Sequence, residues 1–220
     1  MLYQVIICIF LALPIAMSMS RRQSNLWDVN GGSSNNAVLP DIPEPPPKNE
    51  TARMARYIVH YSDWCALAHI SRHANTTGFP VARVYSTADG FTNTSTGVPF
   101  FYVSRMDAHI NDLITDGRCS VTMSLAEGGY CRRERLDPED PRCAQVILTG
   151  QFIFLDPESE LAQQGKLYLF DRHPVMTSWP KGHNWQVGRL KIGNIQVADN
   201  FGGSAFPSVE EYFKANPLAR

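Results

Sequence analysis

Apolar and polar residues alternate along most of the chain after residue 50, and this alternation predicts a domain rich in strands. Successive side chains of a strand point to opposite faces, so alternation indicates one buried and one solvated face. We expect the segment at 185–199 to break into two strands at Gly193. The expected strands are WCALAHIS (64–71), PVARVYST (80–87), VPFFYVS (98–104), CSVTMSLA (119–126), AQVILTGQFIFL (144–155) and WQVGRLKIGNIQVAD (185–199).

Helical spacing and capping residues predict helices between these strands. Ser104 with Asp107, and Ser208 with Glu211, have the spacing of a capping box at a helix start. The expected helices open the domain at TARMARYIVHYSD (51–63), cover Asp107–Thr115 and Ser159–Leu169, and close it at SVEEYF (208–213). Strands dominate and their connections are short enough for antiparallel pairing. We therefore expect a mainly β, α+β fold, a closed or half-open barrel with helices packed over it.

The first residues of the chain have the features of a secretory signal peptide. They carry no charged side chain, and the apolar run Val5–Leu13 is too short to span a bilayer. Ala16 and Ser18 have the size and spacing that signal peptidase accepts, so we expect residues 1–18 to be removed. A short membrane anchor is the alternative. It is disfavoured because Pro14 ends the apolar run and no basic cluster follows at once.

Residues 19–50 form a leader rich in Ser, Asn, Gly and Pro, with the run VLPDIPEPPP near its end. Such a composition buries too little apolar surface to fold, so we expect this leader to be disordered. The folded domain is then expected to cover residues 51–220. No further segment is long and apolar enough to span a membrane.

Composition and motifs exclude several classes of function. The net charge is -1, and no basic run is longer than Arg132-Arg133, so direct binding to nucleic acid is not expected. The chain contains no GxGxxG, no GxxxxGK[ST], no GxSxG and no CxxC motif. The histidines do not form a metal-binding pair in the sequence. These patterns give no sign of a nucleotide loop, a hydrolase nucleophile or a zinc site.

Four cysteines remain once Cys8 leaves with the signal peptide, and they allow three pairings in an oxidising compartment. Cys131 and Cys143 flank a short polar loop that a bridge would staple. Cys65 and Cys119 lie in apolar, strand-like runs, where we expect buried free thiols.

Three N-glycosylation sequons follow the signal peptide, at Asn49, Asn75 and Asn93. Each lies in a polar stretch that resembles a loop. Together with a signal peptide they predict a secreted glycoprotein.

Two polar or aromatic segments look like sites at first sight. The segment HPVMTSWPKGHNW runs from His173 to Trp185, and we favour a packed, turn-rich corner over a binding site. The loop between Cys131 and Cys143 mixes arginines with carboxylates. A solvated loop is favoured there, and a charged lid over a pocket is the alternative.

Several segments, taken in order, resemble the CREG family (cellular repressors of adenovirus early-region-stimulated genes) over about Ala52 to Phe213. They are ARMARYIVHYSDW, GVPFFYVS, VTMSLAEGGYC, DPEDPRC, RHPVMTSWP, HNW, and FGG followed by SVEEYF. The resemblance implies a split β-barrel of the flavin-mononucleotide (FMN)-binding kind, related to pyridoxamine phosphate oxidases. It implies a secreted homodimeric glycoprotein, also found in endosomes and lysosomes. Such proteins regulate growth and differentiation, bind a mannose-6-phosphate receptor through their glycans, and are regarded as non-enzymatic.

The enzymatic relatives of this fold hold the flavin phosphate with a basic residue on the second strand and a basic pair at the start of the next helix. The resemblance places Arg83 and Arg105 at two of these positions, while the third is Met106. It also implies that the loop from about Tyr130 to Cys143 occludes the pocket. We therefore expect no cofactor and only a vestigial flavin site. A flavin-dependent oxidoreductase is the first alternative, and a nuclear transcription factor, which the sequons argue against, is the second.

Overall fold

The computed structural model describes residues 42–219, and a six-stranded antiparallel sheet organises them. The expected signal peptide and most of the expected leader lie outside the described residues. The strands are β1 (Trp64–Ile70), β2 (Pro80–Ser86), β3 (Phe100–Ser104), β4 (Arg118–Ser124), β5 (Gln145–Phe154) and β6 (Trp185–Ala198). The α-helices are α1 (Thr51–Tyr61), α2 (Ala108–Thr115), α3 (Tyr130–Arg133), α4 (Glu160–Arg172) and α5 (Val209–Lys214), and two 3₁₀ turns, η1 (Pro174–Ser178) and η2 (Lys181–His183), precede β6.

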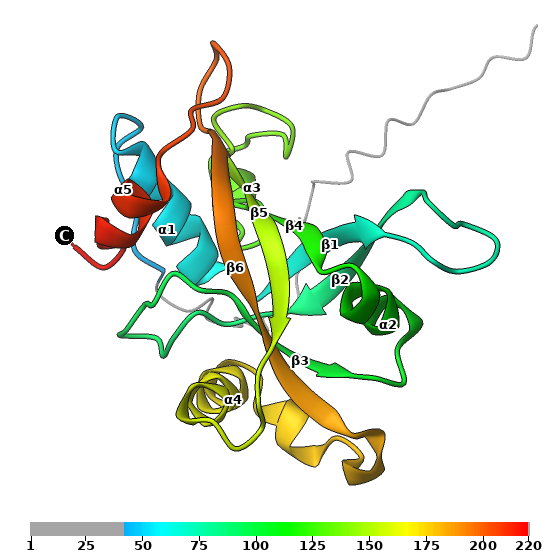
Figure 1. Ribbon diagram of the computed structural model, residues 1–220. Coiled ribbons are helices and arrows are strands. Elements are labelled where there is room, and N and C mark those ends of the chain that lie inside the picture. The colour runs from blue at the N-terminus through cyan, green and yellow to red at the C-terminus, as the bar shows by residue number, and fades with distance from the viewer. Residues whose placement is uncertain (1–41, 220) are drawn as a thin grey trace, which may run out of the picture. The chain divides into compact units, whose positions relative to one another are not determined.

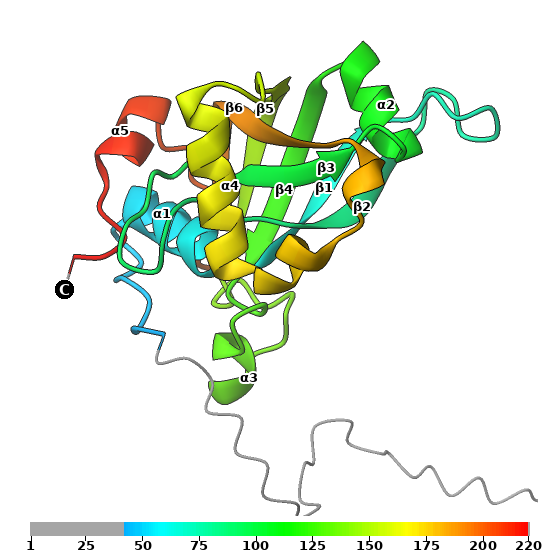
Figure 2. The same cartoon turned by 90° about the horizontal axis from the view of Figure 1, so that it is seen from below.

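The strand order β2-β1-β4-β5-β6-β3 places β2 and β3, which follow each other in the chain, at opposite edges of the sheet. An isolated bridge between Ala88 and Phe100 nevertheless joins the segment after β2 to the start of β3. The sheet therefore curls until its edges meet at this one place, which is the geometry of a split barrel. Figures 1 and 2 show α4 beside β3 and β6, α2 beside β1, and α1 beside α5. The α+β split barrel expected from the sequence is confirmed.

β6 is one continuous strand, so the prediction that it breaks into two strands at Gly193 is wrong. The residue before Gly150 pairs with Asn194 and Gly150 itself with Ile192, which leaves Gly193 as an extra, unpaired residue. A β-bulge of this kind bends a strand without ending it. A Cβ on Gly150 would lie 2.0 Å from the Lys191 carbonyl oxygen, so only glycine fits opposite the bulge.

One of the two expected capping boxes is present. Ser208 and Glu211 form it at the start of α5, each side chain bonding to the other's backbone N–H. At the start of α2, the predicted box between Ser104 and Asp107 is not formed. Asp107 is itself the N-cap, and its carboxylate accepts a hydrogen bond from the His109 backbone N–H at 3.0 Å.

Two apolar clusters hold the domain together. The larger one fills the space between α1 and the sheet, with Ile58, Leu67 and Leu148 almost fully buried. The smaller one lies under α4, where a Cβ on Gly165 would come within 2.5 Å of the Phe100 ring, so glycine allows the helix to approach the strand. Within residues 42–219, the helices lack the length and apolar character needed to cross a bilayer.

The end of the expected leader packs on the domain. Ile42 contacts the larger cluster, and the Tyr57 hydroxyl donates a hydrogen bond to the Pro43 carbonyl. The prediction of disorder up to residue 50 is therefore wrong for residues 42–50. The prolines dominate the composition of this segment and hide the apolar anchor that Ile42 provides.

Candidate functional site

The two arginines expected in a flavin-phosphate site are both exposed and lie near the start of α2. Arg83 belongs to β2, and its guanidinium donates a hydrogen bond to the Asp107 carboxylate, with an N–O distance of 2.7 Å. Arg105 lies in the turn between β3 and α2 and is exposed. Met106, next to it, is 68% exposed and supplies no charge.

Asp107 occupies the place of an anion in this arrangement. One carboxylate oxygen caps α2, while the other accepts from Arg83 and, at 3.1 Å, from the Tyr85 hydroxyl. Burial and the adjacent Asp107 raise the pKa of Tyr85 above its ordinary value, so Tyr85 stays protonated and donates. The positive end of α2 and the one arginine on β2 are thus already neutralised from within the chain.

A flavin phosphate does not fit these residues. A group with nearly two negative charges would meet the Asp107 carboxylate directly after Arg105 and Met106, the positions at which the resemblance implies a basic pair. Replacing that carboxylate as the partner of Arg83 would also take from Asp107 its ion-pair partner, leaving it the hydrogen bonds from Tyr85 and the His109 N–H. The donor set present here is that of a satisfied structural contact.

A second group of polar side chains lies next to this contact. His69 on β1 and His109 and Asp112 on α2 bring three potential ligand atoms within 4.8 Å of one another. His69 Nε2 lies 3.3 Å from an Asp112 carboxylate oxygen, and the two imidazole rings meet edge to face with centroids 5.2 Å apart. Burial lowers the pKa of His69 below its ordinary value, which favours the neutral ring.

Sequence reasoning missed this group because its members lie far apart in the chain. Only the spacing of His109 and Asp112, three residues apart on a helix, places two of them on one face. The third, His69, joins them because the antiparallel sheet carries β1 under α2. The expectation that no histidine forms a metal-binding pair with a neighbour does not extend to the fold, where His69 lies beside His109.

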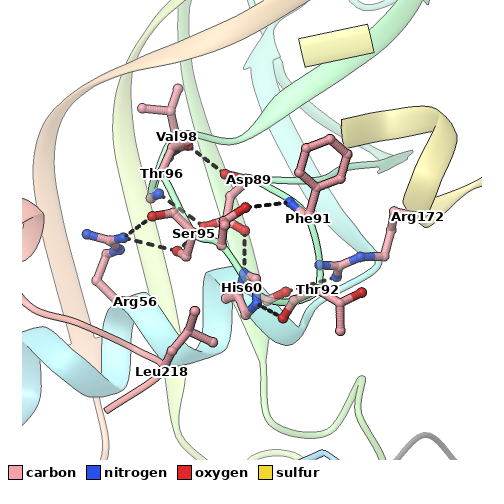
Figure 3. Close-up of polar contacts among 12 residues, drawn as sticks. Arg56, His60, Asp89, Phe91, Thr92, Ser95, Thr96, Val98, Arg172 and Leu218 are labelled. Carbon is pink, nitrogen blue, oxygen red and sulfur yellow. Dashed lines mark hydrogen bonds and ion pairs between the residues drawn. The ribbon is translucent and has the colours of Figure 1, made fainter. Parts of the chain in front are cut away.

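A different buried histidine stands at the centre of the network in Figure 3. His60, on α1, contacts Asp89 through Nδ1 at 2.7 Å and the Thr92 carbonyl through Nε2 at 3.2 Å. Asp89 also accepts hydrogen bonds from the Ser95 hydroxyl and, at 3.0 Å, from the Gly97 N–H. Both ring nitrogens of His60 are paired, as expected for a structural histidine.

Arg56 extends this network to a second helix. Its guanidinium donates to the Ser95 carbonyl and hydroxyl, both at 3.0 Å, and to the carbonyls of Tyr212 and Phe213 on α5, both at 3.3 Å. Figure 3 shows Arg56 and His60 pointing from α1 toward the same loop. The network therefore fixes the loop that carries the Asn93 sequon.

The three sequon asparagines are all exposed and all lie in turns. Asn49 lies just before α1, Asn75 lies between β1 and β2, and Asn93 lies in the loop held by His60. Exposed turns are where a bulky glycan can be carried without displacing packed side chains.

Cys131 and Cys143 form a disulfide, with Cα atoms 5.5 Å apart, while Cys65 and Cys119 are buried free thiols. Burial raises the pKa of the Cys119 thiol to about 12 and that of Cys65 above its ordinary value as well. Neither thiol is a nucleophile at neutral pH.

The disulfide loop contacts α1 and the segment before it. Arg133 pairs with Glu44 at 2.7 Å, and Tyr130 helps to line a small cavity of about 20 Å³ together with Tyr57 and Tyr61. Both Figure 1 and Figure 2 show α3 well separated from α2. Within one chain, the loop thus lies away from Arg83, and any occlusion of that place requires the loop of a second copy.

Glu127 lies just before this loop, and burial raises its pKa to about 7. One carboxylate oxygen accepts from the Ser124 N–H at 3.0 Å, while nearby Asp63 adds to the rise in the pKa. A carboxyl group with this pKa changes its charge between neutral and mildly acidic solution.

The aromatic segment from His173 to Trp185 is the packed corner expected from the sequence. Trp185 donates its indole N–H to the Pro180 carbonyl at 2.9 Å, and His173 Nε2 contacts the Thr87 carbonyl at 3.0 Å. Stacking of Tyr102 on Trp185, with ring centroids 5.2 Å apart, ties this corner to β3. Its polar groups are thus used for packing.

Solved structures with the same fold include a heme binding protein from Mycobacterium smegmatis and ChuZ from Campylobacter jejuni. The first has a TM-score of 0.58 and 18% identity, over 79% of this chain and 63% of that chain. The second has a TM-score of 0.54 and 12% identity, over 80% of this chain and 68% of that chain. At these identities the likeness shows the fold alone.

Sequence comparison is more specific. Chicken (Gallus gallus) Protein CREG1 is 41% identical over 175 residues, covering 78% of this chain and 90% of that protein. Human Protein CREG2 is 40% identical over 174 residues, covering 79% of this chain and 59% of that protein. The family model described as "CREG, beta-barrel" matches residues 46–214, which include every strand and helix above. The chain therefore belongs to the CREG family.

Proposed function

We propose that the protein is a secreted, N-glycosylated homodimer, also delivered to endosomes and lysosomes, that acts by binding partners and regulates cell growth and differentiation. Membership of the CREG family supports this function. The proposal includes a signal peptide at residues 1–18, whose cleavage would remove the apolar run Val5–Leu13.

The observation that carries the non-catalytic part is the contact between Arg83 and Asp107. In a flavoenzyme of this fold, the corresponding arginine is free to bind the phosphate. Here Arg83 binds the Asp107 carboxylate, which also caps α2, so a carboxylate of the same chain takes the place that a phosphate would need. Direct binding of nucleic acid is not part of the proposal, because the net charge is -1 and no basic patch is evident in the sequence.

An absorbance spectrum of the purified secreted protein tests this part. We expect no flavin band near about 450 nm and no haem Soret band. A flavin band at one cofactor per chain would instead support a flavin-dependent oxidoreductase, the alternative function, and would show that the Arg83–Asp107 contact opens to admit the phosphate. A haem band would connect the chain to the activity named for the M. smegmatis protein.

The glycans are proposed to sit on Asn49, Asn75 and Asn93 and to present the protein to a mannose-6-phosphate-type receptor. The exposure of the three asparagines, each in a separate turn, supports this proposal. Glycosidase treatment should lower the apparent mass in up to three steps, and each Asn→Gln variant should remove one of them. A secreted chain whose mass does not change would refute this part.

The homodimer is proposed to form on the face that carries β2. This strand is at an edge of the sheet, and the Val84 side chain on it is 60% exposed. Met106, in the turn before α2, is 68% exposed. Exposed apolar residues beside an unpaired strand edge favour association with a second chain. Light scattering should give a dimer for the native chain and a monomer for Met106→Glu. Phe201→Glu, at an equally exposed residue elsewhere, should stay dimeric.

The partner is best sought by affinity capture with the glycosylated and the enzymatically deglycosylated chain. Partners lost on deglycosylation bind the glycans, as a sorting receptor would. Partners that are kept bind the protein surface. Failure of both forms to retain any partner would count against the proposed function.

A further inference from the structure

We propose that His69, His109 and Asp112 form a binding site for a divalent transition-metal ion of the zinc class. Their ligand atoms lie within 4.8 Å of one another. Two imidazoles and one carboxylate are the ligand types that such ions take, and with three protein ligands a fourth position stays open to water.

The side chains come from two elements that the fold holds together. His69 is on β1, directly across from Cys119 of β4, and α2 packs against β1. His109 and Asp112 are three residues apart on α2 and so project from one face of it. Asp107 fixes the start of this helix through Arg83 and Tyr85, which holds both α2 ligands over the strand.

Unpaired nitrogen atoms are the observation that points to a ligand. Nδ1 of His69 and Nδ1 of His109 are both buried and have no hydrogen-bond partner. The side chain of His69 has an exposed fraction of 0%. One imidazole binds an ion through one nitrogen, so with His69 Nε2 facing Asp112 it is the unpaired Nδ1 of His109 that is available to the ion, while His69 Nδ1 needs a separate partner.

The geometry needs a small adjustment to hold an ion. Ligand atoms about 2.0–2.1 Å from a tetrahedral zinc lie about 3.3 Å from one another. The distance between His69 Nε2 and Asp112 is already 3.3 Å. All three ligand atoms lie within 4.8 Å of one another, and His109 is only partly buried, so rotation of its side chain is the adjustment that would complete the site.

The nature of the ligands selects the ion. Calcium and magnesium prefer oxygen ligands, whereas two imidazoles and a carboxylate suit zinc, cobalt or iron(II). Zinc needs no reducing environment, which suits a secreted protein. A bound ion would join α2 to β1 next to the Arg83–Asp107 contact and would offer its fourth position to an external ligand.

Zinc titration of the secreted, glycosylated chain, first freed of metal with a chelator, tests the site. Calorimetry should give one zinc ion per chain, and zinc should raise the Tm. Asp112→Asn and His109→Ala should each weaken binding at least ~100-fold, since loss of a mere supporting contact already costs 10–100-fold. His73→Ala, which removes an exposed histidine, should bind like the native chain.

Two outcomes overturn the proposal. If zinc does not bind, the three side chains are a structural cluster. If the two ligand variants bind as tightly as the native chain, the ion sits elsewhere. Circular dichroism of the metal-free variants checks their folding. If His109→Ala does not fold, the zinc affinity of the isosteric variant Asp112→Asn decides between the outcomes. Cobalt(II) adds a direct readout, because its visible bands should appear in the native chain and vanish in Asp112→Asn.

Discussion

Two buried histidines, each beside an aspartate, show how differently the same pair of residues is used in this fold. His60 has both ring nitrogens paired, with Asp89 at 2.7 Å and a carbonyl at 3.2 Å. His69 has one long contact to Asp112, at 3.3 Å, and its other nitrogen has no partner. The hydrogen bonding of His60 is complete and that of His69 is not, and this difference separates a structural contact from a candidate site.

The partners of each carboxylate add to the contrast. Asp89 is fully buried at its side chain and receives hydrogen bonds from a histidine, a serine and a backbone N–H. Among residues 42–219, the one hydrogen bond of the Asp112 carboxylate is that to His69, and the Asp112 side chain is 11% exposed. A closed network rigidifies a loop, whereas an open one keeps the capacity to bind something else.

The largest effect is expected for Asp89→Asn. The amide keeps the shape of the carboxylate but replaces an acceptor with a donor inside a network of donors, so at least one buried group loses its partner. The free energy of unfolding should fall by about 3–5 kcal/mol, as for other broken buried pairs. Urea unfolding at constant pH measures it. A loss below about 1 kcal/mol would show that the network around His60 is as loose as the one around His69.

The sequence predicted most of this fold because strands and helices are local patterns. The six strand segments and the helices expected at 51–63 and 159–169, which are Thr51–Tyr61 and Glu160–Arg172 in the structure, follow from local patterns. The Ser208 box follows from capping chemistry. The bulge at Gly193 was missed, since a single extra residue reads like a break when its partner strand is unknown.

The candidate site was only half predictable. Arg83 was found through its resemblance to a phosphate-binding residue, but its partner Asp107 could not be foreseen, because that contact depends on how α2 docks on β2. His69 and His109 are forty positions apart, and only the packing of α2 against β1 brings them together. Clusters built from tertiary contacts leave no spacing in the sequence.

Glu127 is a half-buried carboxyl, and it tests the contrast through pH. Its pKa in the folded state is about 7, against 4.5 for the ordinary carboxyl, so between these values the folded chain holds a proton that the unfolded chain has lost. The contribution of Glu127 to the free energy of unfolding is therefore fully present below about pH 4.5 and is lost as the pH rises through about 7. We expect a loss of about 1–2 kcal/mol from this group after allowance for its partial exposure.

Glu127→Gln should remove this part of the pH dependence. Thermal or urea unfolding at several pH values measures it, and Glu158→Gln, at an exposed position, is the matched control. Parallel pH curves for the native chain and Glu127→Gln would contradict the expectation. Greater stability in acid would suit a protein that passes through endosomes and lysosomes.

Asp112→Asn repeats the first substitution on the open pair and should cost far less. In metal-free buffer only one contact of 3.3 Å is affected, so we expect the free energy of unfolding to fall by about 1 kcal/mol or less. In saturating zinc the cost should grow, since the native chain gains stability from the ion and the variant does not. An equal cost in both buffers would mean that Asp112 supports the fold without binding metal.

The smallest effect is expected for Arg83→Ala, because an exposed ion pair contributes little. The Arg83 side chain is 51% exposed, and Asp107 keeps its hydrogen bonds to Tyr85 and to the His109 N–H without it. The free energy of unfolding should fall by less than about 0.5–1 kcal/mol in urea titration. Asp107→Ala removes the cap as well and should cost about 1 kcal/mol more. If Arg83→Ala cost as much as Asp107→Ala, the arginine would be holding α2 over β1. The Arg83–Asp107 contact would then stabilise the fold as strongly as the hydrogen-bonded network around His60 does, and the start of α2 would depend on the charge of Arg83.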